Sequence, residues 1–82
     1  MRFDAHKFKK ERKRLGLSQS DFARELQKMN HEKASRATVW AWEVLRQQPS
    51  AGFMMSICKI TNRPIDFYNR DTNKGDENDR TK

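Results

Sequence analysis

The chain has 82 residues, of which 34% are hydrophobic and 35% are charged, so it has room for one domain with a modest core. No apolar run approaches the roughly 18 residues that a membrane span needs, and the polar N-terminus lacks the apolar stretch of a signal peptide, which predicts a cytoplasmic protein. The net charge of +7 is concentrated in residues 1–16 and favours a nucleic-acid partner over a membrane, although a solvated, solubilising face would give the same charge.

A first helix is expected to begin after Asp4, whose carboxylate can cap it, and to end at Gly16, which stands where a C-terminal glycine is common. Phe8, Arg12 and Leu15 fall on one face of this helix. The charge of Arg12 therefore occupies a position that faces the core. Either it meets a buried partner there, or it is one more solvated base of a basic helix.

A second helix begins at a capping-box pattern formed by Ser18 and Asp21. Phe22 and Leu26 belong to its inward stripe. Gln19 lies in the first turn, where free backbone N–H groups and the positive end of the helix dipole favour a phosphate. Gln19 therefore either contacts a phosphate or is an ordinary polar residue at a helix start.

A polar stretch, QKMNHEK, leads to a third helix that Ser35 caps and that turns Val39 and Trp42 inward. Trp40 cannot share that face, because residues two apart on a helix point about 200° apart. We expect the outward face to carry five residues: Arg36, Ala37, Trp40, Ala41 and Val44. The outward indole then either meets a ligand or packs against the polar stretch.

A fourth helix follows Ser50 and ends at Asn62, because Pro64 prevents its continuation. The segment PIDFY gives a short fifth helix. No segment shows sustained two-residue alternation, so the predicted fold is all-α, a compact bundle of about five short helices. Residues 1–68 form the predicted domain, and residues 69–82, which contain no apolar side chain, form a polar tail that we expect to be disordered.

The fragments RKRLGLSQSDFARELQ, SRATVWAWE, PS and NRPIDFY occur in this order. Together they resemble the Cro and lambda-repressor-like (XRE-type) family of DNA-binding proteins, over about residues 5–68. The resemblance implies that the second and third helices form a helix-turn-helix whose third helix enters the major groove of DNA. It also implies that Arg12 pairs with Glu43, which is the only acidic residue in residues 33–65.

The same resemblance implies the residues of a DNA-binding surface. Arg36, at the start of the third helix, is the candidate for a bidentate contact to guanine. The candidate DNA contacts are Ser18, Gln19, Ser35, Arg36, Ala37, Thr38, Trp40, Ala41, Arg46 and Gln47. Family members usually bind two-fold operators as homodimers, and we expect the dimer contacts among the C-terminal apolar residues Phe53, Ile65, Phe67 and Tyr68.

Three features depart from the family's pattern. Seven residues separate Leu26 from Ala34, where the family commonly has one or two, so either the second helix is longer or the turn is not of the tight type. Leu45 stands where a turn glycine is usual, which predicts that the third helix runs on further. Glu11 occupies a place in the first helix that is usually apolar.

The sequence therefore predicts a small protein that binds double-stranded DNA sequence-specifically, as a phage- or bacterial-type transcriptional repressor that occludes its operator. The alternative is an antitoxin or adaptor that uses the same fold to bind a protein. An enzyme is disfavoured, because Cys58 lies on the apolar stripe of the fourth helix, where a small core residue is expected. One cysteine and two histidines give neither a disulfide nor a zinc-binding pattern, so we expect no metal and no cofactor.

Overall fold

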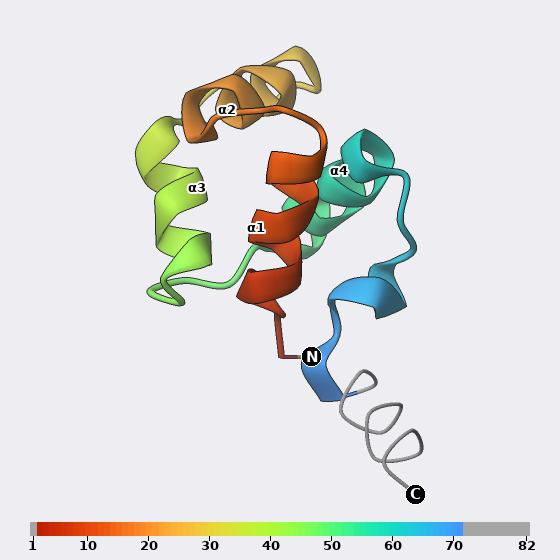
Figure 1. Cartoon of the computed structure of the whole chain (residues 1–82). Coiled ribbons are helices and arrows are strands. Elements are labelled where there is room, and N and C mark those ends of the chain that lie inside the picture. The colour runs from red at the N-terminus through yellow and green to blue at the C-terminus, as the bar shows by residue number, and fades with distance from the viewer. Residues whose placement is uncertain (1, 72–82) are drawn as a thin grey trace, which may run out of the picture.

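The computed structural model describes residues 2–71, and within them the protein is all-α (Figure 1). Four α-helices follow one another along the chain: α1 (Ala5–Arg14), α2 (Gln19–Lys28), α3 (Arg36–Glu43) and α4 (Ala51–Thr61). The expected fifth helix is a single 3₁₀ turn, η1 (Ile65–Tyr68). Within residues 2–71, none of the helices combines the length and the apolar composition needed to traverse a lipid bilayer.

Aromatic side chains from all four α-helices meet in the core. The ring of Phe8 contacts Phe22 edge-on, with 5.0 Å between the centroids, and lies 5.9 Å from Trp42. Trp42 in turn contacts Phe53 at 4.9 Å. Edge-to-face pairs at these separations are favourable. The four helices are therefore packed around one continuous aromatic cluster, to which α3 contributes Trp42.

Each α-helix ends in a chain reversal that uses one residue with a positive φ: Gly16 (72°), Asn30 (74°), Leu45 (60°) and Asn62 (56°). After α3, the backbone N–H of Arg46 donates to the carbonyl of Ala41 at 2.9 Å, which is typical of a Schellman motif. The expectation that the third helix runs on past Leu45 is wrong. It ends at Glu43, and Leu45 itself takes the left-handed conformation, which costs an L-residue about 1–2 kcal/mol.

The long connection between α2 and α3 does not extend α2, which ends at Lys28. The connection lies against α4 instead. The ring of His31 stacks on Phe53 with 4.3 Å between centroids, and its Nε2 lies 2.8 Å from Oγ of Ser56. The side-chain amide of Gln27 donates to the carbonyl of Ala34 at 2.6 Å. These contacts fix the point from which α3 begins.

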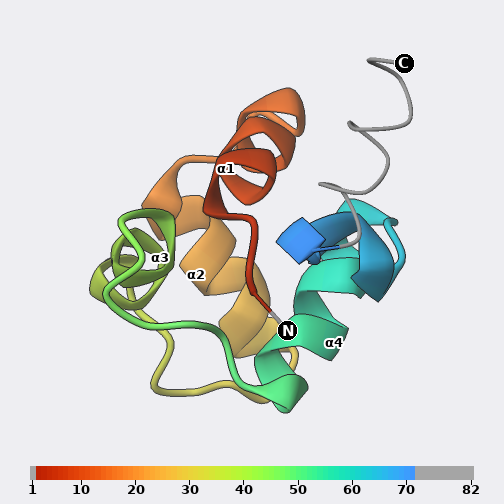
Figure 2. The same ribbon diagram turned by 90° about the horizontal axis from the view of Figure 1, so that it is seen from below.

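The segments before α1 and after η1 run side by side (Figure 2). The N–H of Asp4 donates to the carbonyl of Tyr68, and the N–H of Arg70 donates to the carbonyl of Arg2, both at 2.8 Å. An antiparallel bridge joins Phe3 to Asn69. Residues 69–71, assigned to the tail by sequence, are thus attached to the domain. The rest of that expected tail, residues 72–82, lies outside the described residues.

Most of the expected dimer contacts are used inside the monomer. Tyr68 is fully buried, and its hydroxyl donates to Oγ1 of Thr61 at 2.6 Å, so the prediction that it forms a surface contact is wrong. Phe53 and Phe67 are partly buried and pack against the core. Of the four residues, only Ile65 is exposed. The sequence shows that these side chains are apolar, but not which of them is buried. For the residues of η1, burial depends on the packing of η1 on α1 and α4.

Candidate nucleic-acid interface

Arg12 and Glu43 join α1 to α3 in a buried ion pair. Nε and Nη2 of Arg12 donate to the two carboxylate oxygens of Glu43 at 2.7 and 3.3 Å. Nη1 of Arg12 donates to the carbonyl of Leu17 at 2.7 Å. The two side chains are only 8% and 4% exposed. Both charges are therefore compensated in place, and Arg12 is not a solvated base.

Gln19 and Ser18, at the start of α2, are occupied within the protein. The side-chain amide of Gln19 donates to Glu43 Oε1 at 3.2 Å, so it faces the ion pair. Oγ of Ser18 accepts from the N–H of Asp21, and the Asp21 carboxylate accepts from the N–H of Ser18, which completes the capping box. The hydrogen bond that the backbone N–H of Ser18 donates to the Asp21 carboxylate is the main cause that lowers the pKa of Asp21.

The two indoles of α3 have opposite environments. Trp42 is 1% exposed and contacts the aromatic core, whereas Trp40 is 41% exposed. Arg36 and Ala37 are exposed on the first turn of the same helix, and Val44 is exposed after its last turn. Trp40 therefore contributes to an open surface of α3, whereas the connection places His31 against α4.

Arg46 extends this open surface beyond α3. Its guanidinium lies 5.5 Å from the centroid of the Trp40 ring, within the range of a cation–π contact. The neighbouring Gln47 is also exposed. The reversal at Leu45 brings these two residues back toward α3, where both backbone N–H groups donate to the carbonyl of Ala41.

Three residues of the expected DNA surface are less available than the sequence suggested. Ala41 is only 9% exposed, so its assignment to the outward face is wrong; the chain that reverses at Leu45 folds back onto it. Ser35 caps α3 by accepting from the N–H of Thr38, and Oγ1 of Thr38 accepts from the N–H of Ser35 at 3.2 Å. Both hydroxyls are therefore engaged in a capping box.

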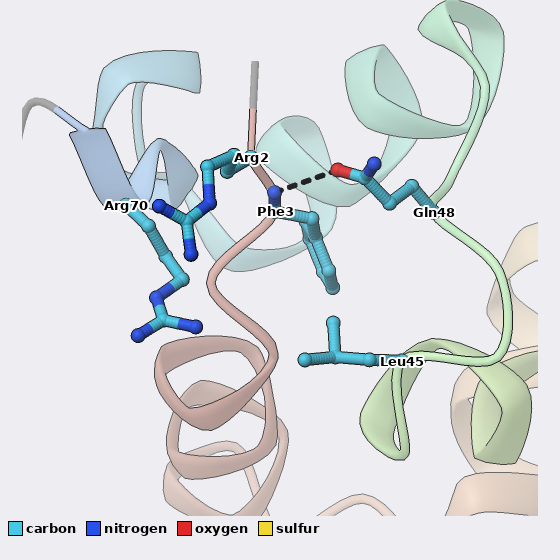
Figure 3. A pocket seen from close by; sticks show the side chains of 5 residues that line it. All are labelled: Arg2, Phe3, Leu45, Gln48 and Arg70. Carbon is cyan, nitrogen blue, oxygen red and sulfur yellow. Dashed lines mark hydrogen bonds between the residues drawn. The ribbon is translucent and has the colours of Figure 1, made fainter.

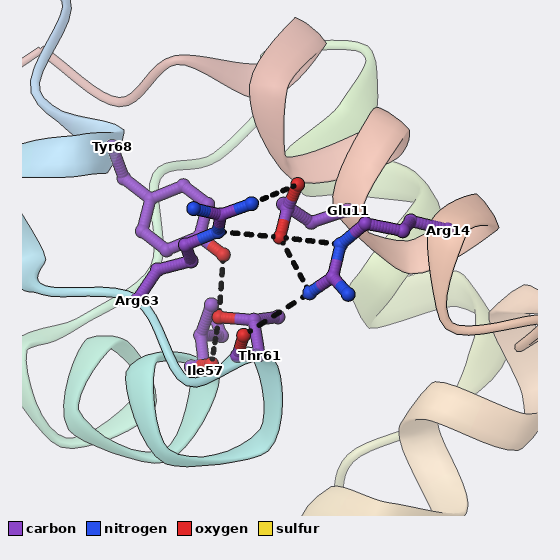
Figure 4. Close-up of polar contacts among 6 residues, drawn as sticks. All are labelled: Glu11, Arg14, Ile57, Thr61, Arg63 and Tyr68. Atoms are coloured by element: carbon purple, nitrogen blue, oxygen red, sulfur yellow. Dashed lines mark hydrogen bonds and ion pairs between the residues drawn. The ribbon is translucent and has the colours of Figure 1, made fainter.

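A second buried ion cluster was not predicted (Figure 4). Glu11 accepts hydrogen bonds from Nη2 of Arg14 and from Nε of Arg63, both at 2.9 Å. Burial alone would raise the pKa of Glu11, but the hydrogen bonds from Arg14 and Arg63 outweigh it and lower the pKa. The sequence does hold a signal: like Arg12, Glu11 is a charged residue at a position of the first helix that faces the core.

The same cluster continues into a hydrogen-bonded chain of neutral groups. The hydroxyl of Tyr68 donates to Oγ1 of Thr61, which donates to the carbonyl of Ile57 at 2.8 Å. Burial raises the pKa of Tyr68 to about 12. The role of this chain is structural, since it connects η1 to α4.

A shallow pocket lies where the chain leaves α3 (Figure 3). Phe3 and Leu45 give it an apolar wall, and Oε1 of Gln48 accepts the backbone N–H of Phe3 at 2.8 Å. The side chains of Arg2 and Arg70 line the other side. One of them, Arg2, lies 3.7 Å from the carboxylate of Asp71. This pocket adds two cationic side chains to the region beyond α3.

Within residues 2–71, no group of three or more His, Cys, Asp or Glu side chains could hold a metal ion. Cys58 is half-buried, and desolvation raises the pKa of its thiol, which disfavours the reactive thiolate. In comparisons with family models, with curated proteins and with solved structures, the chain matches none. Its function is therefore inferred from the geometry and charge of its own residues.

Proposed function

We propose that the protein binds double-stranded DNA sequence-specifically, with α2 and α3 as a helix-turn-helix and α3 in the major groove. One observation carries the proposal: α3 is anchored by Val39 and Trp42, while Arg36 and Trp40 remain exposed. A helix that is held along one side and open along the other fits the major groove, which is wide enough to admit an α-helix.

The distribution of charge supports this proposal. The carboxylates of Glu11 and Glu43 are enclosed with arginines, so they project little negative charge. On α1, Lys9, Lys10 and Lys13 are exposed, and none of them is paired with a carboxylate among residues 2–71. Exposed, unpaired cations are the groups that neutralise phosphates and release counterions when a protein binds DNA.

The proposed biological role is that of a phage- or bacterial-type transcriptional repressor, which occludes polymerase from its operator. We propose that it acts as a homodimer on a two-fold operator whose half-sites lie about one helical turn apart. Ile65 is the expected dimer residue that is still exposed. Sedimentation velocity on an operator-length duplex tests this: two copies of the chain are expected on each duplex, and a single copy would contradict the dimer.

A second candidate function has its own observation. Trp40, Val44 and Leu45 are large apolar side chains that are exposed close together along the chain. Such groups also occur at the centre of protein–protein interfaces, as the antitoxin or adaptor alternative requires. The two candidates differ in what they recognise, because only DNA binding selects a base sequence.

Selection from a random duplex pool at about 150 mM salt tests the proposal, because moderate salt weakens contacts to phosphate alone. We expect enrichment of one two-fold sequence. Equal retention of all sequences, with affinity that falls steeply as salt is added, would leave only nonspecific electrostatic binding and would contradict the proposal.

A further inference from the structure

The open surface of α3 holds few polar groups with which to read bases. The hydroxyls of Ser35 and Thr38 serve the capping box at the start of the helix. Arg36 is the only charged side chain of α3 besides the buried Glu43. The other exposed side chains within α3 and at its C-cap are apolar, namely Ala37, Trp40 and Val44, whereas Arg46 and Gln47 follow only after the chain reversal. Hydrogen bonds from α3 can therefore specify only part of a site.

These apolar side chains share one side of the helix. Ala37 precedes Trp40 by three residues, and Val44 follows it by four, so the three lie next to one another along the helix surface. At the base edges of the major groove, the one apolar group is the 5-methyl group of thymine. We propose that Trp40, with Ala37 and Val44, reads thymine methyl groups; this inference rests on the proposed DNA binding.

The Trp40 ring has a cationic neighbour before any ligand arrives. The guanidinium of Arg46 lies over the ring, 5.5 Å from its centroid. The backbone N–H of Arg46 is bonded to the carbonyl of Ala41, so its place relative to α3 is fixed by the chain reversal. A large, rigid ring gives contact area at a low cost in conformational entropy. Arg46 also places a positive charge beside the ring, where it can meet a phosphate.

The test replaces thymine by deoxyuridine, one position at a time, in the duplex that selection enriches. Deoxyuridine lacks only the methyl group, so base pairing and hydrogen-bonding edges are kept. At each contacted thymine we expect the wild-type affinity to fall about three- to fivefold, which is the effect of leaving one methyl group unburied. Trp40→Ala is expected to prefer thymine to deoxyuridine less than the wild type does, and to bind both duplexes equally at a thymine whose methyl group Trp40 alone contacts.

Two matched variants control for other effects. Met55→Ala removes an exposed apolar side chain from α4 and should keep the wild-type ratio of thymine to deoxyuridine affinity. Arg36→Ala should weaken binding to both duplexes and also keep that ratio. Circular dichroism melting of Trp40→Ala checks that it is folded, which we expect because Trp40 makes no part of the buried core.

The outcomes separate this inference from the proposal on which it rests. If no sequence is enriched from the random pool, DNA recognition itself fails and the inference fails with it. If a sequence is enriched but deoxyuridine is neutral at every position, the inference alone is overturned. It is also overturned if folded Trp40→Ala still prefers thymine to deoxyuridine as strongly as the wild type.

Discussion

Arg12 makes a bidentate ion pair with Glu43, with both side chains more than nine-tenths buried. The same carboxylate accepts a hydrogen bond from Gln19 at the start of α2. The carboxylate of Glu43 in α3 thus accepts hydrogen bonds from α1 and from α2. Glu43 directly follows Trp42, the buried indole that anchors α3 in the core. The orientation of the open surface of α3 depends on this arrangement, so its energetics can be tested apart from any ligand.

Glu43→Gln is expected to lower the free energy of unfolding by about 3 kcal/mol, because it leaves the buried guanidinium of Arg12 without its counter-charge. Urea unfolding measures the change. Glu25→Gln is the control, since Glu25 pairs with Lys28 at the surface of α2, where such a pair contributes about 1 kcal/mol or less. Equal losses in the two variants would show that the buried pair contributes no more than a surface one.

Leu45→Gly is expected to stabilise the protein by about 1 kcal/mol, because glycine adopts the positive φ of 60° without the steric penalty of leucine. The side chain of Leu45 is half-exposed, so its removal forfeits only about half of the area that a fully buried leucine would lose and offsets part of the gain. Thermal melting of the variant measures the gain.

Gly16→Ala is the matched change, and it is expected to lower the free energy of unfolding rather than raise it. Gly16 has a φ of 72° and open space where a Cβ would lie, so Gly16→Ala should lose about 1 kcal/mol through backbone strain alone. A lower melting temperature for Leu45→Gly than for the wild type would contradict the assigned strain.

Glu11 is expected to make the stability of the protein sensitive to acid. Its pKa is lowered in the folded state, so its contribution is complete above the ordinary value of 4.5 and is lost as the pH falls through the lower folded value. The midpoint of urea unfolding should therefore decrease on acidification below about pH 4.5. In Glu11→Gln, the midpoint of urea unfolding should depend less on pH below about pH 4.5 than it does in the wild type. If the midpoint of the variant falls as steeply with acidification as that of the wild type, the effect belongs to other carboxylates.

Periodicity and caps in the sequence were sufficient for much of the fold. The 3.6-residue spacing identified Phe22, Val39 and Trp42 as inward residues, because helix geometry alone determines which residues share a face. Gly16 and Asn62 were identified as helix ends for an equally local reason, namely that each tolerates a left-handed backbone.

The remaining features depend on contacts between distant segments. Leu45 adopts a strained backbone that its residue type disfavours, and the resulting reversal covers Ala41. Tyr68 is buried because η1 packs on α1 and α4, which no local pattern reveals. Glu11 is stabilised by Arg63, a residue 52 positions away. The hydrogen bond from the Gln19 amide to Glu43 likewise joins residues that are distant in the sequence, so no local pattern predicts it.

The central claim is that the outer side of α3 recognises a base sequence, and it is tested most directly by comparing specific with scrambled DNA. The ratio of the two affinities, measured at about 150 mM salt, isolates recognition from phosphate binding. Arg36→Ala removes an exposed positive charge from the first turn of α3, and Lys59→Ala removes one from the last turn of α4.

We predict that Arg36→Ala reduces the ratio by an amount equivalent to about 1–3 kcal/mol, the contribution of one bidentate contact to a base, whereas Lys59→Ala leaves it unchanged. If both variants keep the wild-type ratio, or if the wild type shows no preference for the selected sequence, α3 is not the recognition element.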